Sequence, residues 1–283
     1  TLVIGVLNVT PDSFSDGGLY ARVEAAVARA FDIEREGADI LDIGGESARP
    51  GSEGISAEEE LARVEPVLEA LRGKLTIPIS IDTQKSVVAL RAALSGAELI
   101  NDISALRSDP QLADVARKHR LPVILMHMRG TPRNMQKRPF ARDVLRDVTA
   151  GLRAAVARAR KAGLKREQLI LDPGIGFGKS FRQNYELLAH LDQLARLGYP
   201  LLVGTSRKTF IGATVAQALL PVPASHGGKK GGEIPIAPPS ERIWGTAATI
   251  TAAILGGAHI VRMHDVAEMV QVARTADAVL GAS

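Results

Sequence analysis

Eight short apolar segments recur along the chain, and each ends abruptly in a polar residue or a glycine. Stretches with the 3.6-residue periodicity of amphipathic helices separate them, so strands and helices alternate. The segments are rich in Val, Ile and Leu, as in parallel strands covered on both faces. This pattern predicts an α/β protein, a (β/α)8 barrel whose active site lies at the C-terminal ends of the strands. We expect strands at 2–7, 40–43, 77–81, 99–100, 123–126, 169–171, 201–203 and 259–261.

Helical periodicity and boundary signals predict eight helices between these strands. Ser56 followed by Glu59 has the spacing of a capping box. Glycine follows the last turn of four predicted helices, at Gly37, Gly73, Gly96 and Gly163. We expect helices at 22–36, 57–71, 85–94, 111–118, 141–162, 184–197, 243–255 and 266–280. A single domain over 1–283 is predicted, and the Pro- and Gly-rich stretch 221–239 is expected to be a flexible insertion.

The amino-acid composition and the apolar segments limit the partners and the location that we expect for this chain. The net charge of +4 is mild and aromatic residues make up only 4%, so no nucleic-acid partner is expected. The absence of cysteine excludes disulfides and thiolate metal sites. The opening apolar run stops at Asn8, too short for a secretion signal, and no apolar segment reaches the roughly 20 residues of a membrane span. We therefore expect a cytoplasmic protein that has no membrane partner.

Three of the strand-end residues are suited to holding a flat nitrogen heterocycle. Asp82, Asn101 and Asp172 each follow a predicted strand, and strand ends converge at the mouth of a barrel. Carboxylates accept hydrogen bonds from ring N–H and amino groups, while an amide both donates and accepts. The alternative is that each residue caps its loop. Their convergence in one barrel mouth favours a shared binding site.

The last two strands end in groups that suit an anion. The segment 204–209 contains Lys208 and precedes a short amphipathic helix that begins near Thr209. Backbone N–H groups at such a helix start favour a phosphate or a carboxylate. Arg262 and His264 lie two residues apart on an extended segment, so they are predicted to face the same side and hold oxyanions together.

Several other motifs are weaker signals. The segment ending in Gly178, Lys179 and Ser180 resembles an ATP-binding loop, but Pro173 stands where that motif requires glycine. His127 lacks a partner at metal-ligand spacing, which favours a partly buried barrel histidine over a metal ligand. No Gly-x-Ser-x-Gly motif is present. A mechanism that depends on positioning and electrostatics, without a protein nucleophile, is therefore favoured.

The motifs together resemble one family closely, the dihydropteroate synthases of folate biosynthesis. The matching blocks run in family order over nearly the whole chain, at 5–18, 41–51, 81–83, 100–103, 125–128, 171–179, 206–208 and 261–265. The resemblance implies a transferase that condenses (7,8-dihydropterin-6-yl)methyl diphosphate with 4-aminobenzoate, releasing pyrophosphate with the help of Mg2+. It also implies inhibition by sulfonamides and a homodimer.

The resemblance further implies roles for individual residues. The pterin ring would be bound by Asp82, Asn101, Asp172 and Lys208, with Ile103, Met126, Phe177 and Arg262 around it. The diphosphate would be held by Asn8, Arg262 and His264, with Asn8 also meeting Mg2+. Asp16 and Arg49 would belong to mobile loops that close over the site, and Arg49, Lys208 and Thr209 would frame the aminobenzoate. The implied catalytic residues are Asp16, Arg49 and Lys208.

Two features depart from the family pattern, and three alternatives stay open. Ala48 stands where the family often has threonine, so a hydroxyl contact to the diphosphate is absent there, and the insertion at 221–239 lengthens a segment that is usually shorter. The alternatives are the pterin-binding domain of a corrinoid methyltransferase, an inert homologue that acts as a binding module, and a generic phosphate-binding barrel. The methyltransferase would not be expected to carry the segment 206–208 or the full first loop.

Overall fold

The strands form one parallel sheet that curves into a barrel. The computed structural model describes residues 1–10, 19–137, 141–219 and 234–282. Neighbouring strands follow the order β6-β5-β4-β3-β2-β1-β8-β7. Their bounds are β1 Leu2–Asn8, β2 Ile40–Gly44, β3 Ile79–Asp82, β4 Leu99–Asp102, β5 Val123–Met126, β6 Leu169–Asp172, β7 Leu202–Val203 and β8 Ile260–Met263. The predicted (β/α)8 barrel is thus confirmed.

The barrel closes between the first and last strands of that order, β6 and β7. A parallel bridge pairs Leu171 with Leu201, and the Leu171 N–H donates to the Pro200 carbonyl at 2.9 Å. Closure leaves no long sheet edge exposed, which removes the risk of edge-to-edge pairing with another chain. It also brings the end of β6 beside the end of β7, so residues after the two strands belong to one site.

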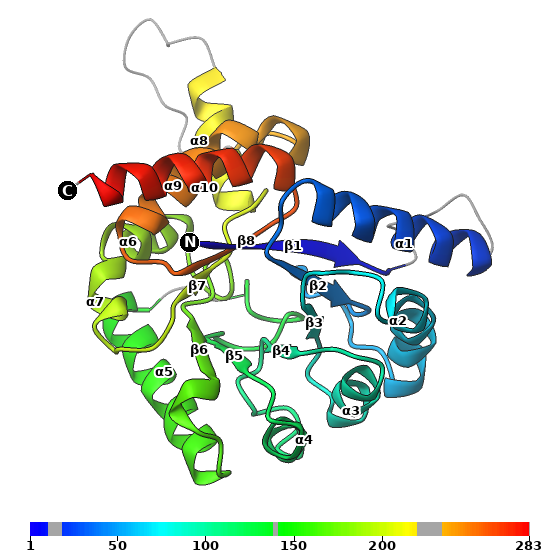
Figure 1. Cartoon of the computed structure of the whole chain (residues 1–283). Coiled ribbons are helices and arrows are strands. Elements are labelled where there is room, and N and C mark those ends of the chain that lie inside the picture. The colour runs from blue at the N-terminus through cyan, green and yellow to red at the C-terminus, as the bar shows by residue number, and fades with distance from the viewer. Residues whose placement is uncertain (11–18, 138–140, 220–233, 283) are drawn as a thin grey trace, which may run out of the picture.

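The helices form an outer ring around the strands (Figure 1). Their bounds are α1 Leu19–Arg35, α2 Ala57–Leu71, α3 Ser86–Leu94, α4 Leu112–His119, α5 Val144–Lys161, α6 Phe181–Ala189, α7 Leu191–Ala195, α8 Thr209–Leu219, α9 Ile243–Leu255 and α10 Val266–Gly281. Short 3-10 turns occur at Arg166–Gln168 and Pro239–Glu241. Among the described residues, no helix is both long enough and apolar enough to span a membrane.

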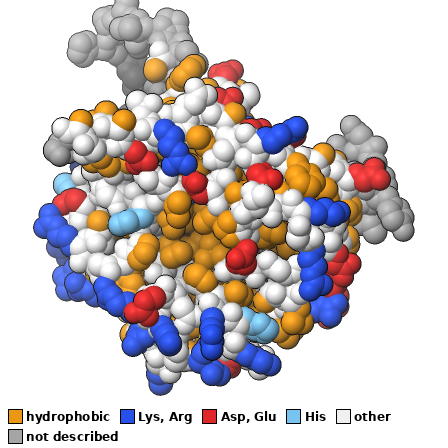
Figure 2. All heavy atoms as spheres, viewed as in Figure 1, with side chains coloured by type: hydrophobic (Ala, Val, Ile, Leu, Met, Phe, Trp, Pro, Cys, Tyr) orange, Lys and Arg blue, Asp and Glu red, His pale blue; other side chains and the backbone are white. Residues whose placement is uncertain are grey.

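Apolar side chains fill two layers of the barrel. The larger layer lies between the strands and the surrounding helices. The smaller layer is made by one residue from each of six strands, namely Ile4, Ile40, Leu99, Ile124, Leu202 and Ile260. In the view of Figure 1, hydrophobic side chains gather over the strands and charged side chains lie mostly around the rim (Figure 2). The packed interior makes the strands a rigid support for the residues that follow them.

Local signals set most element boundaries, and several predicted boundaries need correction, including that of the helix predicted at 22–36, which begins at Leu19. Ser56 caps α2 by accepting from the Glu59 N–H at 3.1 Å, and Gly37, Gly73, Gly96 and Gly163 have positive φ, as predicted for helix ends. β3 begins at Ile79 and not at Ile77, because Pro78 has no N–H to donate to the ladder. Helix α5 begins at Val144 and not at Ala141, because Asp143 caps it.

The predicted helix 184–197 was wrong as a single element. Ser180 caps an earlier start by accepting from the Gln183 N–H at 3.3 Å, so α6 begins at Phe181. His190 has φ −124° and ψ 30°, which is not helical, and it separates α6 from α7. Of the predicted insertion, residues 221–233 lie outside the described part of the chain. Its end is anchored at Ala237, whose N–H donates to the Gly212 carbonyl at 3.0 Å.

Candidate active site

A largely buried cluster of polar side chains lies in the C-terminal halves of β2, β3, β4 and β8, with Asp42 and Asn101 buried and Asp82 and Arg262 partly buried. Asp42 Oδ2 accepts from Asn101 Nδ2 at 3.0 Å and from Arg262 Nε at 2.7 Å. The second arm of the same guanidinium reaches Asp82 Oδ2 at 2.8 Å. The strand register explains this grouping, since Gly44 pairs with Asp82 and Asp82 pairs with Asn101 across adjacent strands. The structure therefore brings the predicted residues Asp82, Asn101 and Arg262 together.

Burial disfavours the charged form of a carboxyl group in this cluster. Burial raises the pKa of Asp82 to about 8, with Arg262 opposing the rise and Asp42 adding to it. Two carboxylates share one guanidinium, and Asp42 is completely buried. The Oδ1 atom of Asp42 has no hydrogen-bond partner among the described residues. The cluster therefore keeps acceptor capacity that a ligand with N–H groups would satisfy.

A second group of site residues follows β6 and β7. Asp172 is buried, and burial raises its pKa while the nearby charge of Lys208 lowers it. The ammonium of Lys208 donates to the Ile175 carbonyl and lies 4.7 Å from the centre of the Phe177 ring, a cation–π contact. Burial lowers the pKa of Lys208 to about 8. A cation, an aromatic face and a buried carboxylate therefore border the same part of the barrel mouth.

The loop between β6 and α6 requires glycine where it approaches β5. Gly174 has φ +65°, and a Cβ there would lie 2.0 Å from the His127 carbonyl oxygen. Gly178 has φ +68°, and a Cβ there would lie 2.6 Å from the Arg129 carbonyl oxygen. Only glycine tolerates both the positive φ and the close backbone approach. This loop is the segment that resembled an ATP-binding motif, and its shape serves packing against β5.

The remaining predicted residues lie around these two groups. Ile103 and Met126 are buried in one apolar cluster, against which Phe177 and Ala48 pack. His264 follows β8, and both its N–H and its Nδ1 lie near Ser206 Oγ, at 3.1 Å and 3.0 Å. Helix α8 begins at Thr209, as predicted.

Of the two residues predicted on lid loops, the structure describes only Arg49. Asp16 lies outside the described residues, whereas Arg49 is exposed on the loop after β2. That loop is partly held in place, because the Gly51 N–H donates to the Pro132 carbonyl at 2.9 Å and Ser52 Oγ donates to the Ser47 carbonyl at 2.6 Å. Arg49 therefore lies at the rim of the barrel mouth and outside the buried cluster.

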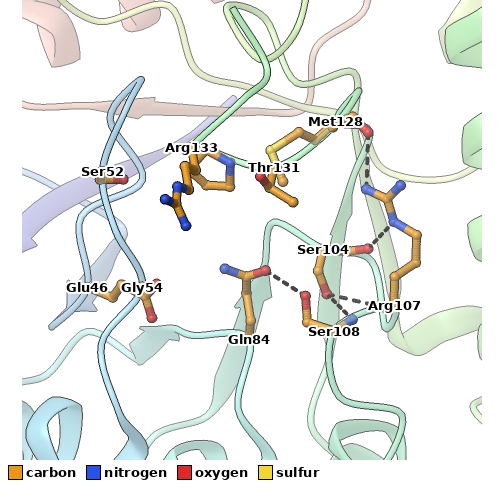
Figure 3. A pocket seen from close by; sticks show the side chains of 12 residues that line it. Glu46, Ser52, Gly54, Gln84, Ser104, Arg107, Ser108, Met128, Thr131 and Arg133 are labelled. Carbon is orange, nitrogen blue, oxygen red and sulfur yellow. Dashed lines mark hydrogen bonds between the residues drawn. The ribbon is translucent and has the colours of Figure 1, made fainter.

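A hollow of about 380 Å³ opens beside the buried cluster, between the loops that follow β2, β3, β4 and β5. Ser52 and Gly54 lie on one side of it, while Gln84 and Arg133 reach into it (Figure 3). A smaller hollow next to it is lined by Asp82 and Ile103 and shares Glu46 and Gln84 with the larger one. The open surface therefore continues from the rim to the predicted pterin residues.

Sequence reasoning missed three buried residues of this region. Asp42 interrupts an otherwise apolar strand, and that interruption was the available signal. Ser206, which contacts His264, was noticed only as part of a motif. Lys179 is 1% exposed, and its ammonium donates to carbonyls of its own loop, which is incompatible with the phosphate-binding role of an ATP-binding motif. His127 is a partly buried barrel histidine, as favoured, and no cluster of three or more acidic, His or Cys ligands occurs in the described part of the chain.

Comparison with known proteins defines first the class and then the family. Residues 4–264 match the family model described as pterin binding enzyme, so the barrel and its strand-end cluster belong to a pterin-binding enzyme. A dihydropteroate synthase from Synechocystis is 47% identical over 278 residues, covering 98% of this chain and 90% of that protein. The chain belongs to the dihydropteroate synthase family.

Solved structures of relatives agree with this assignment. Dihydropteroate synthase from Clostridium difficile, determined in the presence of pteroic acid, has a TM-score of 0.86 and 40% identity, covering 99% of this chain and 96% of that chain. The Yersinia pestis enzyme in a sulfonamide drug complex has a TM-score of 0.87 and 41% identity, with coverages of 99% and 94%. The generic phosphate-binding barrel is therefore excluded as the description of this chain.

Proposed function

We propose that this barrel condenses (7,8-dihydropterin-6-yl)methyl diphosphate with 4-aminobenzoate to 7,8-dihydropteroate and pyrophosphate. The observation that carries the proposal is the largely buried cluster of Asp42, Asp82, Asn101 and Arg262, whose guanidinium is close enough to Asp172 and Lys208 for their charges to interact. A pterin presents ring N–H, amino and carbonyl groups in one plane. Carboxylates, an amide and an ammonium supply the complementary acceptors and donors.

In the proposed complex, Arg262 leaves its internal ion pairs to stack over the pterin. Asp82, Asn101 and Asp172 then accept from or donate to the ring edge, and Lys208 donates to the ring carbonyl. Ile103, Met126 and Phe177 already form the apolar wall. Hydrogen bonds to the pterin ring replace the bonds that Arg262 makes in the free protein. The buried side chains therefore keep hydrogen-bond partners in a pocket without water.

The diphosphate is placed on Asn8, Arg262 and His264. Burial lowers the pKa of His264 to about 4, so His264 is neutral near pH 7 and acts as a hydrogen-bond donor. Chemistry is dissociative in this proposal: pyrophosphate leaves first, and the arylamine attacks the cationic methylene that the electron-rich pterin stabilises. Fixed donors around the leaving group stabilise its developing charge, and no protein nucleophile is needed.

Mg2+ fits the residues around Asn8. A Cβ built on Gly44 would lie 3.8 Å from Asn8 Oδ1 and 3.7 Å from Asp82 Oδ2, so the two oxygens flank the same backbone position. Mg2+ prefers one or two protein oxygens and takes its other ligands from water and substrate phosphates. The ion would neutralise charge on the departing pyrophosphate. Asn8 is the residue that we propose to meet it.

The aminobenzoate is placed at the rim, between Arg49, Lys208 and the start of α8 at Thr209. Solved relatives were determined with 4-aminobenzoic acid and with a sulfonamide drug. A sulfonyl group can take the place of the carboxylate at cationic and N–H donors, so both classes of molecule are assigned to this subsite. Sulfonamides are therefore proposed inhibitors of this chain.

The enzyme is further proposed to work as a cytoplasmic homodimer. Large apolar side chains are exposed on the two last helices, including Trp244 at 81% on α9 and Val279 at 60% on α10. Exposed apolar surface of this kind supports burial in a subunit interface. Light scattering should give a mass twice that of one chain, and the mass of one chain would contradict the dimer.

A coupled assay of pyrophosphate release tests the proposed reaction. Release should require both pterin diphosphate and 4-aminobenzoate, and dihydropteroate should accumulate in equal amount. Calorimetry with methyl-tetrahydrofolate distinguishes the methyltransferase alternative, because that enzyme class would bind this ligand. Absence of release with both substrates, together with intact pterin binding, would favour an inert binding module.

The rate is expected to fall as pH rises through about 8, because Lys208 loses its proton there. Lys208→Arg keeps a charged group at alkaline pH and should remove this decline. Initial rates of both proteins across neutral and alkaline pH give the comparison. An unchanged decline in the variant would assign the titration to another group.

A further inference from the structure

Lys179 is a buried cation that none of the proposed substrate contacts uses. Its ammonium donates to the carbonyls of Gly174 at 2.8 Å, Phe177 at 3.0 Å and His127 at 3.1 Å. A fourth contact joins the ammonium to His127 Nδ1 at 3.0 Å. The residue is 1% exposed, so water does not replace these partners. One side chain thus connects the loop after β6 to the end of β5.

The four described contacts of the Lys179 ammonium are to three carbonyl oxygens and one ring nitrogen. Burial lowers the pKa of His127 to about 3, so its ring is neutral. The three N–H groups of the Lys179 ammonium already meet three carbonyls, so His127 Nδ1 shares one of these donors. Burial also lowers the pKa of Lys179 to about 7, with the charge of Asp172 opposing that shift. No ion pair between Lys179 and a carboxylate occurs within 4.0 Å in the described part of the chain. Carbonyl dipoles, rather than a counter-ion in contact, therefore surround the ammonium.

The same loop carries two groups of the proposed pterin site. The Ile175 carbonyl accepts from Lys208, and the Phe177 ring lies beneath the Lys208 ammonium. The flanking Gly174 carbonyl and the Phe177 carbonyl both point to Lys179. Without a donor at that position, both carbonyls would be buried without a hydrogen-bond partner. Because that state is costly, we expect the loop to change its conformation. A change of shape would move Phe177 and the acceptor of Lys208 together.

We propose that Lys179 is a positioning residue for the pterin site, and that its ammonium holds the loop 173–178 in the shape that aligns Phe177 and Lys208 with the ring. This inference rests on the proposed pterin site. Lys179 itself touches no substrate in this arrangement. It acts from beneath the loop, on the side that faces β5.

The first test compares wild type with Lys179→Met, which keeps the length of the side chain and removes its charge and its donors. Pteroic acid is the probe, and calorimetry gives its affinity while thermal unfolding reports stability. We expect a folded variant that binds pteroic acid at least about tenfold more weakly, from the loss of hydrogen bonds that hold the loop. Equal affinity in a folded variant would overturn the proposal. A variant that fails to fold would assign Lys179 to the barrel as a whole and would also overturn it.

A chemical rescue separates charge from packing, because the chain contains no cysteine. In Lys179→Cys the single thiol is alkylated in the unfolded chain and the protein is refolded. Bromoethylamine restores an ammonium at nearly the original length, whereas propyl iodide gives a neutral side chain of the same size. Wild type taken through the same steps serves as the matched control, since it has no thiol to react.

The two alkylated forms should differ in affinity for pteroic acid. The aminoethyl form is expected to bind within about threefold of wild type, and the propyl form to remain at least about tenfold weaker. Equal affinities of the two forms would show that packing alone shapes the loop. If wild type itself does not bind pteroic acid, the proposed pterin site fails. That outcome is distinct from wild-type affinity in Lys179→Met, which overturns only the role of Lys179.

Discussion

Replacing Asp172 by alanine is expected to weaken pterin binding by about 2 to 4 kcal/mol, because ring N–H groups are left without an acceptor in a dry pocket. Asp172 ends β6, is buried, and lies close enough to Lys208 for their charges to interact. Its Oδ1 also accepts from the Gly174 N–H at 2.6 Å, so the carboxylate is held in place. Calorimetry with pteroic acid measures the loss.

Two further variants make that result interpretable. Asp172→Asn keeps the size and one acceptor oxygen, so it should lose less than Asp172→Ala while keeping the bond to Gly174. Asp114→Ala removes an exposed carboxylate from α4 and should leave pterin binding unchanged. Unchanged affinity in Asp172→Ala, with the folded state intact, would remove Asp172 from the pterin site.

Arg49→Ala is expected to lower turnover by about two orders of magnitude or more while pterin diphosphate still binds. Arg49 is exposed at the rim, and the described contacts of its loop hold Ser52 and Gly51 but leave the guanidinium outside the buried cluster. In the proposed closed complex with both substrates, its charge would lie near the departing pyrophosphate and the aminobenzoate carboxylate. Asp16 is proposed to act with it, and Asp16→Ala should show the same division between turnover and binding.

The measurement for Arg49 separates steady-state turnover from the equilibrium affinity for pterin diphosphate. Arg35→Ala is the matched control, because Arg35 is an exposed arginine in the last turn of α1, outside the candidate site, with a side chain 76% exposed. It should change turnover by less than about threefold, as expected for an exposed charge screened by solvent. Equal losses of turnover and affinity in Arg49→Ala would show that the loop is a preformed wall of the binding site.

Much of the fold could be predicted because its signals are local. The alternation of apolar segments with helical periodicity predicted the barrel, since each strand and each helix carries its own pattern. Helix ends at Gly37 and Gly163 were predicted because a positive φ belongs to the glycine itself. The strand-end positions of Asp82, Asn101 and Asp172 were predicted because parallel strands of a barrel all end at one face.

The tertiary structure decided which of these side chains meet and which groups hold them. Asp42 could not be assigned from its own strand, because its partners Asn101 and Arg262 come from β4 and β8. The proposed role of Lys179 depends on the His127 carbonyl. Its oxygen lies 3.1 Å from the Lys179 ammonium, although the two residues are 52 positions apart in the chain. Sequence by itself determined the periodic elements and the residue types at strand ends, since these depend on neighbours along the chain. Pairing, burial and the resulting pKa values depend on neighbours across the barrel, which only the closed sheet brings into contact.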